Sequence, residues 1–208
     1  FTGSQIPLGQ IRSDGRDNII SSLLIAASGQ VHEVCIYFNG VLLRGNRSTK
    51  RSSDQFEAFE SPNDAPLAHA GIQIEYKKRV LRPASEEAFR FQPFKELPIG
   101  VIKIFPGIQF DYFASLMTDK LKGVVLETFG AGNIPGSAQN ALLPIIERAY
   151  KNGTIITVCS QCSQGAVSLG TYAASSALRR VGAVNGRDMT TEAALAKSYY
   201  LMSISDDM

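Results

Sequence analysis

The sequence has no tryptophan, two histidines and three cysteines among its 208 residues. Secreted domains that depend on disulfides use more cysteines and use them in pairs, so Cys35, Cys159 and Cys162 favour a reducing compartment. No apolar run approaches the roughly 20 residues that are needed to span a bilayer. From these absences we expect a cytoplasmic protein that has no membrane partner.

Basic and acidic residues are nearly balanced. The 21 basic and 19 acidic residues leave a net charge of +2, and no run of Lys or Arg forms a patch, so we expect no nucleic-acid partner. The common site motifs GxSxG, the P-loop, HExxH and the EF-hand loop are missing. The rest of the composition, 44% apolar and 19% charged, is that of an ordinary globular protein with a sizeable core.

The first residues of the chain predict a strand, a loop and a helix. We interpret Phe1 to Gly3 as the end of a strand that runs into a Gly/Pro loop. Ser13 or Asp14 can cap the helix that follows, in which apolar residues recur at helical spacing until Gly29 ends it.

A β-hairpin is predicted next. Residues 33–38 are an apolar strand, Asn39-Gly40 suits a type I′ turn, and residues 41–44 return as the partner strand. Residues 44–54 have the composition of a loop, and residues 71–81 alternate weakly enough to predict one or two short strands.

The second half has a more regular pattern, after a polar linker over residues 82–97. Strands are expected at residues 99–105, 122–129 and 154–158, and helices at residues 110–117, 137–150, 168–181 and 190–202. Strands that alternate with helices at this spacing predict a parallel sheet covered on both faces. The predicted fold is α/β: the remainder of an N-terminal Rossmann-like α/β domain at residues 1–81, followed by a smaller C-terminal parallel-sheet α/β domain at residues 98–208.

Residue chemistry alone leaves several sites open. The loop Gly130–Gly136 has three residues between its second and third glycines and therefore misses the dinucleotide fingerprint, which leaves a structural turn or a small-ligand loop. Cys159 and Cys162 form a CxxC that suggests a redox pair, half of a zinc site, or one core thiol and one loop thiol. Lys50 is a solvated loop lysine unless burial or a neighbouring cation turns it into a base.

Five segments taken together resemble the asparaginase family, and specifically its cytoplasmic type I branch. They occur in the same order and register and cover nearly the whole chain: Phe1-Thr2-Gly3-Ser4-Gln5, Ser13-Asp14-Gly15-Arg16-Asp17-Asn18, Arg44-Gly45-Asn46-Arg47-Ser48-Thr49-Lys50, Glu127-Thr128-Phe129-Gly130-Ala131-Gly132-Asn133 and Asp188-Met189-Thr190-Thr191-Glu192-Ala193.

The resemblance implies hydrolysis of L-asparagine to L-aspartate and ammonia through an acyl-enzyme, with no metal or cofactor. Lys50 matches the catalytic lysine that supports proton transfer to a threonine. Ser4 matches a residue whose backbone carbonyl accepts a hydrogen bond from the side-chain amide of the substrate. The corresponding acid lacks this donor, so the contact helps to distinguish the amide from the acid. Asn133 matches a loop that approaches the active site of a neighbouring subunit, which implies a homo-oligomer, either a dimer or a tetramer.

The resemblance also extends to a second, allosteric asparagine site. Thr49 and Cys162 match positions that line this site in type I members. Glu127 departs from the arginine of the bacterial members that have the site, and a glutamate would repel the carboxylate that an arginine clamps. The resemblance therefore implies an altered allosteric site.

The nucleophilic threonine and the Thr-Asp pair of the family do not occur at matching positions in residues 1–208. We therefore expect the nucleophile to lie outside this chain, and we expect these residues alone not to hydrolyse asparagine. Two alternatives are a truncated relative that binds asparagine or a partner without catalysis, and a glutaminase-type subunit that supplies ammonia for tRNA-linked amidation.

Overall fold

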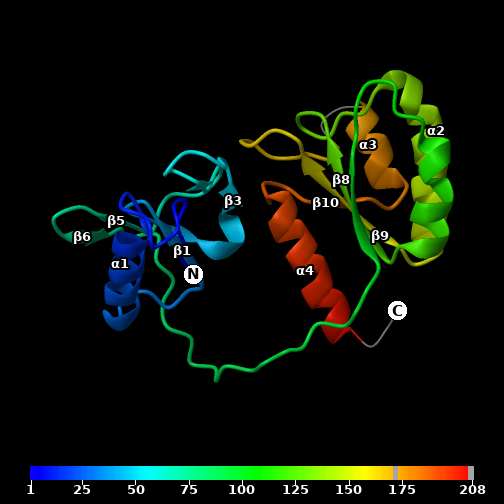
Figure 1. Cartoon of the computed structure of the whole chain (residues 1–208). Coiled ribbons are helices and arrows are strands. Elements are labelled where there is room, and N and C mark those ends of the chain that lie inside the picture. Colours follow the sequence, from blue (N-terminus) through cyan, green and yellow to red (C-terminus); the bar gives the residue numbers. More distant parts are fainter. Residues whose placement is uncertain (171–172, 206–208) are drawn as a thin grey trace. The chain divides into compact units, whose positions relative to one another are not determined.

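The computed structural model describes residues 1–170 and 173–205, and the chain divides into two compact units. The first unit is Phe1–Arg90 and the second is Phe91–Met208 (Figure 1). Residues 82–97 form neither a helix nor a strand, and the division falls within them. No helix among the described residues is long and apolar enough to cross a membrane.

The first unit contains one helix and short antiparallel strands. Helix α1 is Gly15–Ala27. The four-stranded sheet has the order β1-β2-β5-β6, with β1 at Cys35–Phe38, β2 at Val41–Arg44, β5 at Ala68–Ala70 and β6 at Ile74–Tyr76. A 3₁₀ turn at Gly45–Arg47 leads to a separate pair of strands, β3 at Thr49–Lys50 and β4 at Phe59–Glu60.

Local sequence signals are confirmed in this unit. Asn39 and Gly40 have φ angles of 47° and 78°, as a type I′ turn requires, and they join β1 to β2. Helix α1 begins directly after Asp14, and Gly29, with φ of 66°, follows its end. The hairpin and the helix are therefore determined by residues next to each other in the chain.

The expectations for the shorter segments were less accurate. Phe1 to Gly3 are not assigned as a strand, although the Phe1 amino group donates to Cys35 O (2.7 Å) and Tyr37 N–H donates to Phe1 O (2.9 Å). This alternation of hydrogen bonds is that of a parallel pair. The region interpreted as a loop contains β3, and β5 was not predicted, because strands of two or three residues are too short to show a period.

The second unit has the parallel sheet that the sequence predicts. Its order is β10-β9-β8-β7, and every pair is parallel. The strands are β7 at Ile99–Lys103, β8 at Gly123–Thr128, β9 at Ile155–Ser160 and β10 at Val184–Asn185. The helices are α2 at Gly136–Lys151, α3 at Ala173–Arg180 and α4 at Thr191–Ile204. The helix predicted at residues 110–117 is instead a 3₁₀ turn at Phe110–Phe113 and a π turn at Leu116–Lys120.

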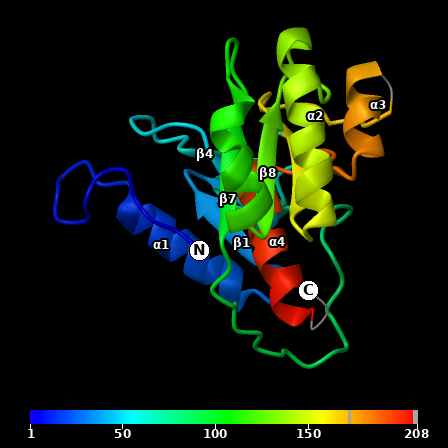
Figure 2. The same cartoon turned by 90° about the vertical axis from the view of Figure 1, so that its right-hand side faces the viewer.

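Helices cover both faces of this sheet. Alternation along β8 directs Val124 and Leu126 into the cluster that contains α2 and α3 residues, and directs Val125 toward Ala194 of α4. In Figures 1 and 2, α2 and α3 accordingly lie on one side of the strands and α4 on the other. The ends of β8 and β9 thus belong to a sheet that helices cover on both faces.

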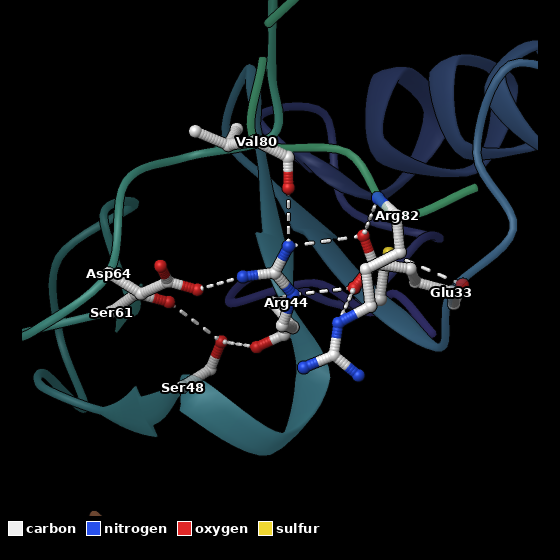
Figure 3. A network of polar contacts seen from close by, with 8 residues as sticks. Glu33, Arg44, Ser48, Ser61, Asp64, Val80 and Arg82 are labelled. Carbon is white, nitrogen blue, oxygen red and sulfur yellow. Dashed lines mark hydrogen bonds and ion pairs between the residues drawn. The ribbon is translucent and has the colours of Figure 1, made fainter. Parts of the chain in front are cut away.

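A buried charged network centred on Arg44 connects the parts of the first unit (Figure 3). The Arg44 guanidinium donates to both carboxylate oxygens of Glu33 (2.5 and 3.1 Å), to Asp64 (2.5 Å) and to the Val80 carbonyl (2.7 Å). The backbone N–H of Arg82 also donates to Glu33 at 3.0 Å. The side chains of Arg44 and Glu33 are 11% and 6% exposed, so this pair is shielded from water.

The network makes stability depend on pH. Hydrogen bonds from Arg44 lower the pKa of Glu33, and burial acts in the opposite direction without cancelling them. A lowered folded-state pKa means that Glu33 contributes stability above its unfolded pKa, roughly 4.3, and loses that contribution as the pH falls through the folded value.

We expect Glu33→Gln to lower the free energy of unfolding at pH 7 by about 2 kcal/mol, because Arg44 loses one of its two carboxylate acceptors. The difference from wild type should shrink as the pH falls from ~5 to ~3, where Glu33 itself becomes neutral. Urea unfolding followed by circular dichroism at several pH values measures both effects. Glu86→Gln, at an exposed position of the linker, is the matched control. A difference that stays constant over this pH range would contradict the assigned role of Glu33.

Candidate active site around Lys50

The turn that leads to Lys50 is fixed by close backbone contacts. Gly45 N–H donates to Val34 O at 2.9 Å, and a Cβ on residue 45 would lie 2.9 Å from the same oxygen, so glycine is required by space. The buried Ser48 hydroxyl donates to Arg44 O (2.7 Å) and lies 3.1 Å from the Ser61 hydroxyl. These contacts fix the backbone between Arg44 and Thr49, where β3 begins.

Lys50 itself is exposed and has two contacts. It pairs with Phe59 across β3 and β4, and its ammonium group lies 5.4 Å from the centroid of the Phe59 ring. The ammonium also donates to Gln5 Oε1 at 3.2 Å. A cation over an aromatic face is attracted by the ring quadrupole, so these contacts hold the charged end of Lys50 in one place.

Gln5 reaches Lys50 because its own segment is held by polar residues near the start of α1. The Asp14 carboxylate accepts from the N–H groups of Gln5 (3.0 Å) and Ile6 (3.0 Å). Asn18, 3% exposed, donates to Gly3 O at 2.9 Å, and its side-chain oxygen accepts from Asn39 N–H at 3.0 Å. Asp14 and Asn18 therefore determine the path of residues 3–6.

The charge of Asp14 is stabilised by these contacts. Burial raises the pKa of this carboxyl, but hydrogen bonds from the N–H groups of Ile6 and Gln5 outweigh burial, and the pKa lies below its ordinary value. Ser13 or Asp14 was predicted to cap α1. The Ser13 hydroxyl accepts from Gly15 N–H at 3.0 Å, whereas Asp14, at the N-cap position, makes no side-chain capping hydrogen bond. Its carboxylate accepts hydrogen bonds from the preceding loop and from the Asn18 side chain instead.

The two segments enclose a pocket of ≈ 220 Å³, hereafter the Lys50 pocket. Its lining includes Ser4, Gln5 and Lys50, together with the rings of Phe38 and Phe59. The structure thus brings together Ser4 and Lys50, which were predicted as site residues from distant segments. Gln5 was not predicted as a site residue, although it directly follows Ser4 in the sequence. The pocket combines a cation, an amide side chain and an apolar wall, which suits a small polar substrate.

The remaining predicted residues lie on other elements. Thr49 precedes Lys50 on β3 in the first unit. Asn133 is exposed in the second unit, in the turn after β8, where its N–H donates to Phe129 O (2.8 Å) and its carbonyl accepts from Phe129 N–H (2.9 Å). Glu127, on β8, accepts from the hydroxyl of Thr191 at 2.5 Å, and Cys162 is exposed after β9.

The two cysteines of the CxxC differ in environment. Cys159 is completely buried and Cys162 is exposed, as the interpretation with one core thiol and one loop thiol predicts. Burial, aided by the nearby charge of Glu127, raises the pKa of Cys159 to about 11. Redox-active thiols have lowered pKa values, so this environment argues against redox chemistry. Among the described residues no group of three or more His, Cys, Asp or Glu side chains could hold a metal ion.

Comparison with known proteins gives a consistent result. The family model "Asparaginase, N-terminal" matches residues 1–82, and the model "Glutaminase/Asparaginase C-terminal domain" matches residues 98–208. The chain is 41% identical to L-asparaginase 1 of Escherichia coli over 97% of its own length and 59% of that protein. It is 40% identical to the human 60 kDa lysophospholipase (97% of this chain, 35% of that protein). It is 29% identical to one component of the glutamyl-tRNA(Gln) amidotransferase of Pyrococcus abyssi (100% and 48%).

A solved structure agrees with the sequence relatives. L-asparaginase I from Vibrio cholerae superposes with a TM-score of 0.88 at 41% identity, covering 97% of this chain and 60% of that one. The chain therefore spans about three fifths of the length of these two bacterial relatives. Matching family models over both units, together with the shared fold, establish that the chain belongs to the asparaginase family.

Proposed function

We propose that this chain forms part of an L-asparagine amidohydrolase, which converts asparagine and water to aspartate and ammonia. The observation that carries the proposal is the Lys50 pocket, in which Lys50, Ser4 and Gln5 meet from segments 45 residues apart along the chain. The family membership and the two bacterial relatives named L-asparaginase support the same activity.

In the proposed mechanism Lys50 assists a hydroxyl nucleophile. Its amine form takes the hydroxyl proton, and the oxygen attacks the side-chain amide carbon of asparagine. The Ser4 carbonyl accepts a hydrogen bond from the amide nitrogen, which favours the amide over the acid because the acid lacks that donor. Ammonia leaves, and water then hydrolyses the acyl-enzyme. No metal or cofactor takes part in this proposal.

The remaining roles are proposals of the same kind. The threonine nucleophile is expected outside residues 1–208, Asn133 is assigned to the active site of a neighbouring subunit in a homo-oligomer, and the protein is placed in the cytoplasm. Thr49, Glu127 and Cys162 are assigned to an altered allosteric site. The 29% identity to an amidotransferase component favours a second, weaker candidate, a glutaminase-type subunit for tRNA-linked amidation.

Ammonia release from L-asparagine and from L-glutamine, with and without glutamyl-tRNA, separates the two candidates. We expect asparagine to be the better substrate in a form of the protein that carries the threonine. Residues 1–208 alone should release no ammonia, and turnover by them would contradict the assignment of the nucleophile outside this chain. Ammonia release from glutamine that depends on the tRNA would support the amidotransferase candidate instead.

We expect Lys50→Met, in the form that carries the threonine, to lower kcat by a factor of about 10² to 10⁴, the usual contribution of a positioned proton-transfer group. The melting temperature should change little, because Lys50 is exposed. Lys77→Met, at another exposed lysine of the first unit, is the matched control and should retain full activity. Ammonia release close to wild type in Lys50→Met would remove Lys50 from the mechanism.

Asp14→Asn should act on the pocket indirectly. The amide can orient one oxygen toward the N–H groups of Gln5 and Ile6, but it loses the charge that those donors stabilise. We expect KM for asparagine to rise several-fold as the path of residues 3–6 loosens. Asp17→Asn, exposed in the first turn of α1, is the control that removes an acid from the same helix without touching the loop. An unchanged KM in Asp14→Asn would show that this carboxylate does not position the pocket.

A further inference from the structure

The β1–β2 hairpin has two faces, and the face away from α1 is also apolar. Tyr37 and Leu42 are cross-strand partners and pack into the core of the first unit. Because side chains alternate along a strand, Phe38 and its partner Val41 lie on the opposite face, as does Leu43. This second face borders the Lys50 pocket through Phe38.

Phe59 divides the second face into two hollows. Its ring packs against Phe38 with centroids 5.3 Å apart and planes inclined by 54°. On one side of these rings is the Lys50 pocket, and on the other is a hollow of ≈ 310 Å³, hereafter the second hollow. Phe38 and Phe59 line both, so the two hollows share an aromatic wall.

The second hollow has an apolar floor and a charged rim. Val41, Leu43 and Pro66 line the floor beside the two rings. At the rim the Arg51 guanidinium lies 3.8 Å from the carboxylates of both Glu57 and Glu60. Long, exposed ion pairs of this kind contribute little energy, so the rim groups stay hydrated.

The size of the second hollow limits what it can hold. An apolar cavity of about 150 Å³ accepts a benzene molecule. A hollow of ≈ 310 Å³ that is open on one side therefore has room for one aromatic ring or a branched alkyl group together with its linking atoms. Free asparagine has no such group and would leave this floor exposed to water.

The position of Phe59 links the second hollow to the chemistry at Lys50. Lys50 and Phe59 are cross-strand partners, and the ammonium lies 5.4 Å from the centroid of the ring that walls the second hollow. The Phe59 ring therefore borders both the space beside Lys50 and the hollow that Val41 and Leu43 line.

We propose that the second hollow is a subsite for an aryl or alkyl group carried on the nitrogen of a side-chain amide. The proposal rests on the proposed function, which places the amide carbonyl beside Lys50. A secondary amide keeps one N–H, which still donates to the Ser4 carbonyl, while its substituent extends past Phe59. Attack by the hydroxyl oxygen breaks the carbon–nitrogen bond, and an amine leaves in place of ammonia with the proton that Lys50 took from the hydroxyl. Water then hydrolyses the acyl-enzyme, supplying the new carboxyl oxygen and restoring the hydroxyl proton.

Binding to the second hollow is tested first on the unmodified chain with N-benzylacetamide as the probe. In methyl NMR spectra we expect the signals of Val41 and Leu43 to shift on titration. Leu42, which lies between them on the opposite face, is the internal control and should not shift. Unchanged signals from Val41 and Leu43, or equal shifts at Leu42, would overturn the subsite.

The second test compares L-asparagine with N4-benzyl-L-asparagine by isothermal titration calorimetry. The benzyl compound should bind on the order of tenfold more tightly, because the ring leaves water for an apolar floor. Val41→Phe fills the hollow and should abolish this advantage without changing the affinity for L-asparagine. Val101→Phe, at an exposed strand position of the second unit, is the matched control and should leave both affinities unchanged.

The two tests also separate this proposal from the proposed function. Binding of N-benzylacetamide at Val41 and Leu43 without any binding of L-asparagine would refute the asparagine site and support the apolar hollow. Binding of L-asparagine with equal affinity for its benzyl derivative would support the asparagine site and refute the subsite.

Discussion

The fold of the first unit depends on one buried guanidinium. Arg44 contacts Glu33 before β1, Asp64 before β5 and the Val80 carbonyl after β6, so one side chain connects three segments of the first unit. Two carboxylates and a carbonyl satisfy the charge and the donors of Arg44, which makes its burial tolerable. Removing the Glu33 carboxylate leaves the donors that face it without a charged acceptor, while Asp64 still pairs with Arg44, so part of the cost of burying the guanidinium is no longer offset.

The Lys50 pocket follows from that constraint. Residues 45–50 leave the Arg44 network through a glycine that no larger residue can replace and a serine that bonds back to Arg44. Residues 3–6 are held in the same way by Asp14 and Asn18. Among the segments that resemble the asparaginase family, residues 13–18 and 44–49 mainly hold the two backbone paths, whereas residues 1–5 and Lys50 line the pocket. The proposed chemistry uses Lys50 and Ser4, and Gln5 accepts a hydrogen bond from the Lys50 ammonium.

The sequence predicted what short-range patterns determine. The spacing of apolar residues correctly predicted the parallel sheet of the second unit, and Asn39-Gly40 correctly predicted the hairpin turn. Strands β3, β4 and β5 have two or three residues and carry no readable period, and the bond between Lys50 and Gln5 joins residues 45 positions apart, which no local pattern encodes. Lys50 was assigned a role through resemblance alone, since its residue type and spacing indicate a solvated lysine equally well.

Glu127 makes an internal contact at the start of α4. Its carboxylate accepts from the hydroxyl of Thr191, the first residue of α4, at 2.5 Å. A helix N-terminus carries partial positive charge, so an anion there stabilises α4 against β8. An arginine at the same position would be repelled by that helix end and would bind a carboxylate ligand instead. The Glu127 carboxylate is thus engaged in an internal contact, which supports the proposal that the allosteric site is altered in this protein.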